Sequence, residues 1–426
     1  MKARAVVNHL KSPASTDAPS VLFVTYGNGH VAKVSPVVAA LRERGVVVVV
    51  MALTLGLKQA QVMGLQPVSY RDYLHFVDSE RALAFGRELL AGNSHPDVDE
   101  SESVAYLGIN FLDWVERFGL QEAHRRYAEG GRRAFLPLNF IGKLIDEVRP
   151  GLIVSTASPR SEQAAIEAGV ARGIPTMTMM DLFALPHDNF RRNTVFADRI
   201  TVLSEFARSN LLDEGIDADR VVVTGCPAYD KLFDPLQAQA GADWKRSMGW
   251  QDKHVVMWAG NLEEAAPNVP EHYLGAGLGI LVERKLRAWV AANESLALVV
   301  RYHPNQYHLF PDLGAQDRVY TSNPRQDAMH PQLHAVDCVV TQTSTVGFEG
   351  VLIGKRLLAL SFSPWAINFD FDYGKLGLGE SVSSLDELTA VLNRENVPPI
   401  AAGLLPPQGL ATPRVLQHVM QLLQRQ

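Results

Sequence analysis

Cysteine is nearly absent from this sequence. The 426 residues include two, Cys226 and Cys338, which is too few for the disulfide framework that holds many small secreted domains together. Because such sparse cysteine usage is typical of proteins in a reducing compartment, we expect a cytoplasmic protein.

Long apolar runs are absent as well. A helix that spans a bilayer needs about 20 consecutive, mostly apolar residues, whereas the run Val46–Leu53 has the length of a buried strand. The first residues, Met1–Ala18, carry scattered charges and no apolar core, which argues against a signal peptide. The sequence therefore predicts no membrane span and leaves peripheral membrane contact open.

A surplus of positive charge is also missing. Lysine and arginine number 40 against 46 aspartates and glutamates, which gives a formal net charge of −6. Nucleic-acid binders usually show a basic surplus, so we expect no nucleic-acid partner. No group of His, Cys and Asp has metal-ligand spacing, and no Gly-x-Ser-x-Gly elbow occurs. We therefore expect neither a metal site nor a serine hydrolase.

What the sequence does contain is a regular alternation of apolar runs with helical patterns, which is typical of parallel α/β architecture. Its length suits two such domains. We predict an N-terminal domain at 1–235 and a C-terminal domain at 236–426, with the last helix packing back on the first domain. The segment Asp234–Asp243 is the best linker candidate, and a long, mostly helical stretch occupies residues 57–148.

The apolar runs predict strands in both halves. In the first half they lie at 21–25, 46–52, 151–155, 176–180, 199–203 and 221–224, and in the second at 254–258, 296–302, 336–340 and 356–360.

A glycine-rich segment, Tyr26–His30, follows the first predicted strand. Gly27 and Gly29, with Asn28 between them, let the backbone approach a ligand closely, and the helix that follows offers free N–H groups to an anion. His30 closes the segment. Because histidine titrates near neutrality, it suits a general base acting on an acceptor hydroxyl. A tight strand-to-helix turn explains the same pattern equally well, and both interpretations stay open.

Other polar loop residues of the first half follow predicted strands. Asp181 comes directly after one strand and is a second candidate for the base. Ser158, Arg160 and Glu162 come after another strand and are further candidates for facing the acceptor, although polar loop residues are usually just solvated. Solvated loop side chains are the plain alternative for all of these.

In the second half, one strand ends in Arg301-Tyr302-His303-Pro304-Asn305. Arg301 and His303 would present a cation and an imidazole at the sheet edge, and both can hydrogen-bond a phosphate. Pro304 stops the strand and fixes the turn. A turn with surface polar residues is the alternative.

Three consecutive hydroxyl residues, Thr343, Ser344 and Thr345, precede a predicted helix. Hydroxyls and free backbone N–H groups at a helix start make a phosphate site. Glu349 lies one to two turns into the helix, where a carboxylate can hold a ribose diol. A simple N-cap on a packing helix accounts for one of the hydroxyls, but less well for three.

Gly260 and Asn261 end a further strand of this half, where glycine again allows close approach of a ligand. An ordinary turn fits them equally well. Each of these motifs falls at the carboxyl end of a predicted parallel strand, which is where ligands bind in doubly wound folds. Their shared position is the main argument for a binding site.

These motifs carry a family resemblance that covers the whole chain. The chain resembles the GT-B glycosyltransferases and the related UDP-N-acetylglucosamine 2-epimerases. The opening strand, loop and helix of that superfamily are similar to VLFVTYGNGHVAKVSPVVAALRERG. The segment that leads into its second domain is similar to VVVTGCPAYDKLF. Its donor-binding strand, loop and helix are similar to VVTQTSTVGFEGVLIGKRLLAL. The pair RYHPN and TSTVGFEG is also similar to bacterial capsule transferases that use CMP-Kdo or CMP-sialic acid.

The resemblance implies two Rossmann-like, doubly wound domains that face a cleft. It implies that His30 contacts the acceptor or acts as base, that residues 343–345 hold the donor phosphate, and that Glu349 takes the ribose. In the capsule transferases the His-Pro motif, here His303 and Pro304, binds CMP, so the nucleotide stays open between UDP and CMP. The epimerases carry Gly-Thr-Arg-Pro-Glu and Ser-Gly-Gly loops where this chain has Gly-Asn-Gly-His and Thr-Ser-Thr. Both departures favour a transferase.

The leading hypothesis is a metal-independent glycosyltransferase that moves a sugar from a UDP- or CMP-activated donor to a hydroxyl acceptor in glycan or surface-polysaccharide synthesis. It would need no cofactor beyond the nucleotide-sugar substrate. The acceptor is a glycan, a lipid-linked or a small molecule. A sugar-nucleotide epimerase or hydrolase is the first alternative, and a non-catalytic nucleotide-sugar binding module is the second. The oligomeric state stays open.

Overall fold

The computed structural model describes residues 20–95, 97–180, 182–185, 190 and 193–424. The chain folds into two compact units. Unit 1 comprises Met1–Ala228 together with Pro406–Gln426, and unit 2 comprises Tyr229–Leu405. The ranges predicted from the sequence are 1–235 and 236–426, so the division between the units falls earlier in the chain, within the Gly-x-Pro segment after the sixth strand.

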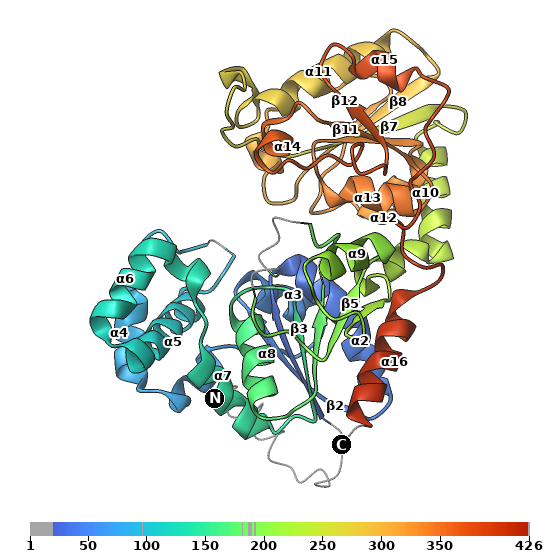
Figure 1. Cartoon of the computed structure of the whole chain (residues 1–426). Helices are drawn as coiled ribbons and strands as arrows, with labels where there is room; N and C mark the ends of the chain where they lie inside the picture. The colour runs from blue at the N-terminus through green and yellow to red at the C-terminus, as the bar shows by residue number, and fades with distance from the viewer. Residues whose placement is uncertain (1–19, 96, 181, 186–189, 191–192, 425–426) are drawn as a thin grey trace. The chain divides into compact units, whose positions relative to one another are not determined.

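Unit 1 is built on a six-stranded sheet in which every strand pairs in parallel, in the order β2-β1-β3-β4-β5-β6 (Figure 1). Its strands are β1 (Ser20–Tyr26), β2 (Val47–Leu53), β3 (Leu152–Thr156), β4 (Thr176–Met179), β5 (Arg199–Val202) and β6 (Val221–Val223). The helices that connect or cover them are α2 (Asn28–Glu43), α3 (Leu55–Val62), α8 (Ser161–Ala171), α9 (Glu205–Asp213) and α16 (Ala411–Leu423). Apolar residues of α16 share a buried cluster with those of α2, so the last helix forms part of the core of unit 1.

The helical stretch after β2 forms a group beside the sheet of unit 1 (Figure 1). Its elements are η1 (Arg71–Phe76), α4 (Ser79–Leu89), α5 (Glu100–Phe118), α6 (Leu120–Gly130), η2 (Gly131–Ala134) and α7 (Leu138–Val148). Helices α4 and α5 touch at two glycines. A Cβ on Gly108 would lie 1.8 Å from the carbonyl oxygen of Ala82, and one on Gly86 would lie 2.0 Å from that of Val104. The backbones can approach this closely because neither position carries a side chain.

Unit 2 contains a second six-stranded parallel sheet, in the order β12-β11-β10-β7-β8-β9. Its strands are β7 (His254–Gly260), β8 (Leu296–Tyr302), β9 (Val319–Thr321), β10 (Cys338–Thr341), β11 (Arg356–Leu360) and β12 (Glu380–Val382). Its helices are α10 (Pro235–Ser247), η5 (Glu271–Tyr273), α11 (Gly277–Ala291), η6 (Tyr307–Leu309), α12 (Met329–Ala335), α13 (Thr345–Leu352), α14 (Pro364–Asn368) and α15 (Leu388–Leu392), and η4 (Pro227–Phe233) begins at the division between the units. The predicted fold class, two doubly wound α/β domains, is confirmed.

The structure corrects two of the sequence-based boundaries. The segment Asp234–Asp243, predicted as a linker, lies in α10, where Asp234 caps the helix and Pro235 occupies its first turn. Residues 28–30, predicted as loop, form the first turn of α2, and Pro36 lies inside that helix. From the sequence we predict that this helix starts only at Ser35, because proline favours the first turn of a helix and Pro36 follows directly.

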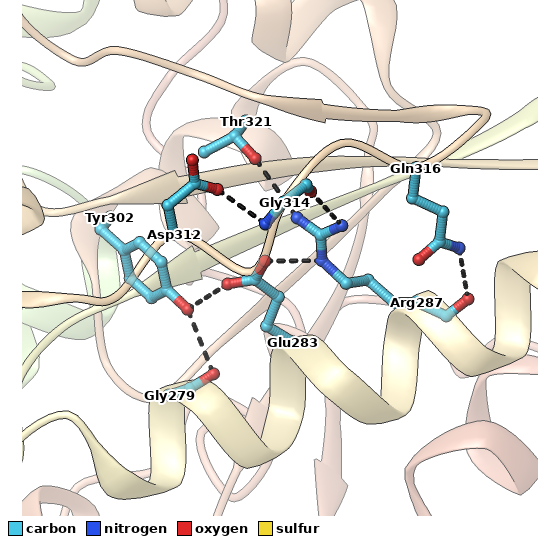
Figure 2. A network of polar contacts seen from close by, with 8 residues as sticks. All are labelled: Gly279, Glu283, Arg287, Tyr302, Asp312, Gly314, Gln316 and Thr321. Atoms are coloured by element: carbon cyan, nitrogen blue, oxygen red, sulfur yellow. Dashed lines mark hydrogen bonds and ion pairs between the residues drawn. The ribbon is translucent and has the colours of Figure 1, made fainter.

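A buried polar network fixes the loop that follows β8 to helix α11 in unit 2 (Figure 2). The Arg287 Nε donates to Glu283 Oε1 at 2.7 Å, and the hydroxyl of Tyr302 donates to Glu283 Oε2 at 2.6 Å. The same guanidinium donates to the carbonyl of Gly314 at 3.0 Å. The side chains of Arg287 and Glu283 are 7% and 3% exposed, so this ion pair is shielded from solvent.

Among the helices in the described part of the chain, none combines the length and the apolar character needed to cross a membrane. Peripheral membrane contact stays a prediction.

Candidate functional site

Each sheet has one point where the strand order reverses. In unit 1 this point lies between β1 and β3, since β2 is added on one side of β1 and β3 to β6 on the other. In unit 2 it lies between β7 and β10. In open parallel sheets, the carboxyl ends of the strands at such a switch point diverge into a crevice where ligands bind. The residues that follow β1, β3, β7 and β10 are therefore the ones to inspect.

In unit 1, the loop after β1 is tightly packed at Gly27. This residue has φ +75° and precedes α2. Gly56 of α3 lies against it, because a Cβ on Gly56 would be 2.8 Å from the Gly27 nitrogen. Gly29 and His30 lie in the first turn of α2, which is also where Asn28 begins the helix. The close packing makes this turn a rigid support for the side chain of His30.

His30 is held by a hydrogen bond across the switch point. Its Nδ1 lies 2.8 Å from the hydroxyl of Thr156 at the end of β3. That hydroxyl is 3.5 Å from the hydroxyl of Thr25 on β1. Thr25 and Thr156 are both buried, so the ring is oriented by groups that solvent does not reach. The second predicted base, Asp181, lies outside the described residues.

A buried carboxylate lies near the imidazole. Glu162, in the first turn of α8, is fully buried, and neither of its oxygens has a hydrogen-bond partner in the described part of the chain. Burial raises the pKa of Glu162, while the nearby His30 and Arg160 act in the opposite direction. The hydroxyl of Ser158 is likewise buried without a partner among the described residues. An unpaired carboxyl of this kind is typical of acid–base sites.

In unit 2, one side chain links the two loops at the switch point. Gln342, directly after β10, accepts a hydrogen bond from the Asn261 backbone N–H at 3.2 Å and donates one to the Asn261 carbonyl at 2.9 Å. Gly260 in turn accepts from the backbone N–H of His303 at 2.9 Å. The loops after β7, β8 and β10 are thereby joined at one edge of the sheet.

The predicted hydroxyl loop lies at this edge. Ser344 is the N-cap of α13, and its Oγ accepts from the N–H of Val346 at 3.4 Å. Thr343 and Ser344 are partly accessible and Thr345 is exposed. First-turn N–H groups of a helix have no acceptor within the helix, so this loop combines hydroxyls with available backbone donors.

Of the two polar side chains of the Arg-x-His-Pro motif, Arg301 is buried and His303 is exposed. Arg301 is 7% exposed, and its guanidinium donates to Ser322 Oγ at 2.6 Å and to Gln332 Oε1 at 3.1 Å. It therefore lies inside unit 2 and ties α12 to the segment after β9. His303 and Pro304 are exposed, at the end of β8. Of this motif, His303 is the polar side chain that a ligand can reach.

Glu349 lies on the second turn of α13 in a largely enclosed position. Its side chain is 14% exposed, and Oε2 is 3.8 Å from His330 Nε2. Burial raises the pKa of Glu349 to about 7. The negative charge of Glu349 adds to the burial that raises the pKa of Tyr373, whose hydroxyl is 3.5 Å from the Thr343 carbonyl. Tyr373 thus connects Glu349 to the hydroxyl loop.

A second acid of unit 2, Glu263, lies close to the β7 loop. It is 4% exposed, Oε2 accepts from the Trp365 N–H at 2.9 Å, and Oε1 is buried without a partner among the described residues. Burial raises the pKa of Glu263 to about 7, and the hydrogen bonds from Trp365, Gln342 and Ser363 lower it by less. In the sequence, Glu263 is one of two consecutive glutamates that follow the predicted strand at 254–258. The sequence does not show that its side chain is buried.

We expect Glu263 to make unit 2 less stable as the pH rises. A carboxyl with a raised pKa in the folded state stabilises the fold fully below its unfolded pKa of about 4.3, and this contribution is lost as the pH rises through about 7. Between pH 5 and pH 8, the free energy of unfolding of the wild type should fall by about 2 kcal/mol more than that of Glu263→Gln. Urea unfolding followed by tryptophan fluorescence measures the difference. Equal pH dependence in both proteins would show that Glu263 is ionised in the fold throughout this range.

Sequence reasoning missed four residues of these two edges. They come from segments that carry no glycine-rich or hydroxyl signal: Arg132 and Arg133 line a pocket with Tyr26, Tyr106 lies near Arg160, and His330 lies 3.8 Å from Glu349. The first three belong to the helical group of unit 1, and only the fold brings them beside β1 and β3.

No protein-family model matches the sequence, and no curated protein is detectably similar to it. Solved structures do match, over nearly the whole chain. The UDP-GlcNAc 2-epimerase from Neisseria meningitidis bound to UDP-GlcNAc has a TM-score of 0.56 and 14% identity, covering 94% of this chain and 100% of its own. The S. aureus MnaA–UDP co-structure has a TM-score of 0.56 and 14% identity, covering 95% and 97%.

The Methanocaldococcus jannaschii UDP-GlcNAc 2-epimerase in complex with UDP-GlcNAc and UDP has a TM-score of 0.52 and 14% identity, covering 94% of this chain and 99% of its own. At this level of identity, the likeness concerns the arrangement of the backbone. The chain therefore has the two-domain, doubly wound GT-B fold of these solved structures.

Proposed function

We propose that unit 2 binds the nucleotide of a UDP-activated sugar at the edge where β7 and β10 end. The observation that carries the proposal is the pair of hydrogen bonds between Gln342 and Asn261, which joins the β7 loop to the hydroxyl loop at the switch point. The accessible hydroxyls of residues 343–345 and the first N–H groups of α13 suit a diphosphate. Glu349, in the next turn, is proposed to take the ribose.

The reaction we propose first is conversion of the sugar nucleotide itself, as an epimerase or hydrolase. It is supported by proteins that share the fold: two of them are named UDP-GlcNAc 2-epimerases and have been solved with UDP-GlcNAc, and MnaA has been solved with UDP. Breaking the bond between sugar and UDP leaves charge on the diphosphate, which oriented N–H groups and hydroxyls stabilise. A proton must also be moved, and we assign this role to His30 with the support of Thr156. The proposal invokes no cofactor.

Glycosyl transfer to a hydroxyl acceptor is the second candidate. The observation that favours it is the chemistry of the two loops, because Gly-Asn-Gly-His and Thr-Ser-Thr differ from the corresponding epimerase motifs. In this reaction the imidazole of His30 would take the proton of the acceptor hydroxyl. The two candidates differ in one measurable respect, since only the transferase needs an acceptor to consume the donor.

The test begins with calorimetry of UDP, CMP and GDP on the purified chain and on Ser344→Gly. Glycine keeps an N-cap at a cost of a few tenths of a kcal/mol and removes the hydroxyl. We expect UDP to bind and Ser344→Gly to weaken it about 10-fold, the cost of one hydrogen bond to a charged group. The matched control is Ser204→Gly, the N-cap of α9 in unit 1, which should bind UDP like the wild type. Binding of none of these nucleotides would contradict the proposal.

The reaction is then followed with UDP-GlcNAc, with and without sugar acceptors, by UDP release and by chromatography of the sugar. Loss of UDP-GlcNAc without an acceptor identifies the epimerase or hydrolase. Loss that requires an acceptor identifies the transferase. Tight binding without loss of donor under either condition would leave the non-catalytic binding module as the function of the protein.

A further inference from the structure

A pocket of about 710 Å³ opens in unit 1 beside the ends of β1 and β3. Tyr26, the last residue of β1, and Arg160, at the start of α8, form one side of it, and Arg132 and Arg133 of η2 form another. Its volume falls in the range of sites for small ligands, roughly 300–1,000 Å³. It also lies at the switch point of the sheet, where ligands bind in this class of fold.

The charge of this pocket is of one sign. Three of its lining residues are arginines, and none of the described lining residues is acidic. Guanidinium groups remain protonated at any physiological pH and present a planar fork that matches a carboxylate or a phosphate. Three of them around one hollow repel one another unless an anion lies between them.

On the neighbouring helix α6, the arginines are paired with glutamates. Two of the three Arg-Arg pairs in the sequence lie seven residues apart, at 125–126 and 132–133. The first pair lies on α6, where Arg125 bonds Glu122 and Glu129, and Arg126 bonds Glu122 at 2.8 Å. The second pair, Arg132 and Arg133, has no ion pair or hydrogen bond from its guanidinium groups among the described residues. The pair that lines the pocket is therefore the one left without acidic partners.

Arg160 is held in place without neutralising its charge. Its guanidinium carbon lies 3.8 Å from the centre of the Tyr26 ring, a cation–π arrangement. In the described part of the chain, no carboxylate lies within ion-pair distance of it. Burial by itself would raise the pKa of Tyr26, but the charges of Arg160 and Arg132, together with the hydrogen-bonding side chains of Arg160 and Thr54, outweigh burial and lower it. The hydroxyl of Tyr106, which is also close to Arg160, is buried without a hydrogen-bond partner among the described residues.

From the pocket, its three arginines and the missing acidic partners, we infer that unit 1 binds an acidic sugar whose carboxylate or phosphate group is held by Arg132, Arg133 and Arg160. The inference rests on the proposed function only in taking the ligand to be a sugar; the anion site itself does not depend on it. An acidic sugar here would be the acceptor of a transferase, or a regulatory ligand of an epimerase. Tyr26 would then pack against the sugar ring beside the anion.

Calorimetry with glucose 6-phosphate, glucuronate, inorganic phosphate and neutral glucose tests the inference on the full chain. We expect at least one acidic sugar to bind, and neutral glucose to bind at least 10-fold more weakly. Arg132→Ala with Arg133→Ala should weaken the acidic sugar by about 100-fold or more, since a hydrogen bond to a charged group is worth about 1.5–3 kcal/mol. Preference for glucose 6-phosphate or for glucuronate tells which acidic group the pocket takes.

Arg87→Ala is the matched control, because Arg87 is an exposed arginine on α4 that does not line the pocket. It should bind the acidic sugar like the wild type. The inference is overturned if the double variant binds as tightly as the wild type, or if neither the acidic sugars nor inorganic phosphate bind the wild type at millimolar concentration. A UDP titration of the same proteins separates the two proposals. UDP binding should be unchanged in the double variant. If UDP binds neither the wild type nor the variants, the proposed nucleotide site is rejected, and the acidic-sugar titrations still test the anion site independently.

Discussion

Replacing His30 by alanine is expected to lower the turnover of the sugar-nucleotide reaction by about 10²–10⁴-fold, the usual contribution of a general acid or base. UDP affinity should stay within about twofold of the wild type, because the proposed nucleotide groups all belong to unit 2. The physical basis is the hydrogen bond of 2.8 Å between His30 Nδ1 and the Thr156 hydroxyl, which fixes the ring that we assign to proton transfer. Initial rates and calorimetry with UDP measure the two quantities.

Two further variants separate a catalytic role from a structural one. Thr156→Val keeps the volume of a buried side chain and removes the hydroxyl that orients the ring, so it should lower kcat about 10-fold with little change in KM. His124→Ala removes an exposed histidine of α6 and should leave turnover unchanged. If His30→Ala turns over like the wild type while UDP still binds, the assignment of His30 as the proton-transfer group is wrong.

Much of the fold follows from the sequence because the central strands of a parallel sheet are apolar on both faces. The run Leu296–Tyr302 is predicted with the bounds it has as β8. The edge strands β9 and β12 are missed, since each has three residues and is only partly buried. The start of α2 is misplaced because Pro36 has the preference of a first-turn residue, yet lies inside a helix that Gly27 already begins.

The sequence predicts only part of the candidate site, because it shows where a motif lies along a strand but not how its side chains are oriented. Motifs that directly follow central strands, such as Gly260 with Asn261 and the hydroxyl loop, can be placed at an edge of the sheet from the sequence alone. The sequence does not tell which way a side chain near the end of a strand points. Arg301 therefore looks like a ligand of phosphate, whereas the structure turns it toward Ser322 and Gln332. Arg132 and Arg133 of η2 belong to the helical group of unit 1, and no local sequence pattern predicts that this group packs beside β1 and β3.

Replacing Glu283 by alanine is expected to destabilise unit 2 by about 3–5 kcal/mol, the cost of removing one partner of a buried ion pair. The change leaves the Arg287 guanidinium, 7% exposed, without its carboxylate, and removes the acceptor of the Tyr302 hydroxyl at 2.6 Å (Figure 2). Arg287 also donates to Gly314, so the loop after β8 should loosen with it. This loop begins at His303, and the loss therefore reaches one edge of the proposed nucleotide site.

Tryptophan fluorescence during urea unfolding reports this change well, because five of the six tryptophans lie in unit 2: Trp244, Trp250, Trp258, Trp289 and Trp365. The double variant Glu283→Leu with Arg287→Met should recover most of the lost stability, since an apolar pair of similar volume replaces a buried ion pair at little or no cost. Lys285→Ala on the same helix, whose partner Asp386 is 99% exposed, should cost less than about 1 kcal/mol. If Glu283→Ala unfolds at the same urea concentration as Lys285→Ala, the network does not stabilise unit 2, and the loop after β8 is held by its apolar contacts, chiefly the stacking of Tyr302 on Phe310.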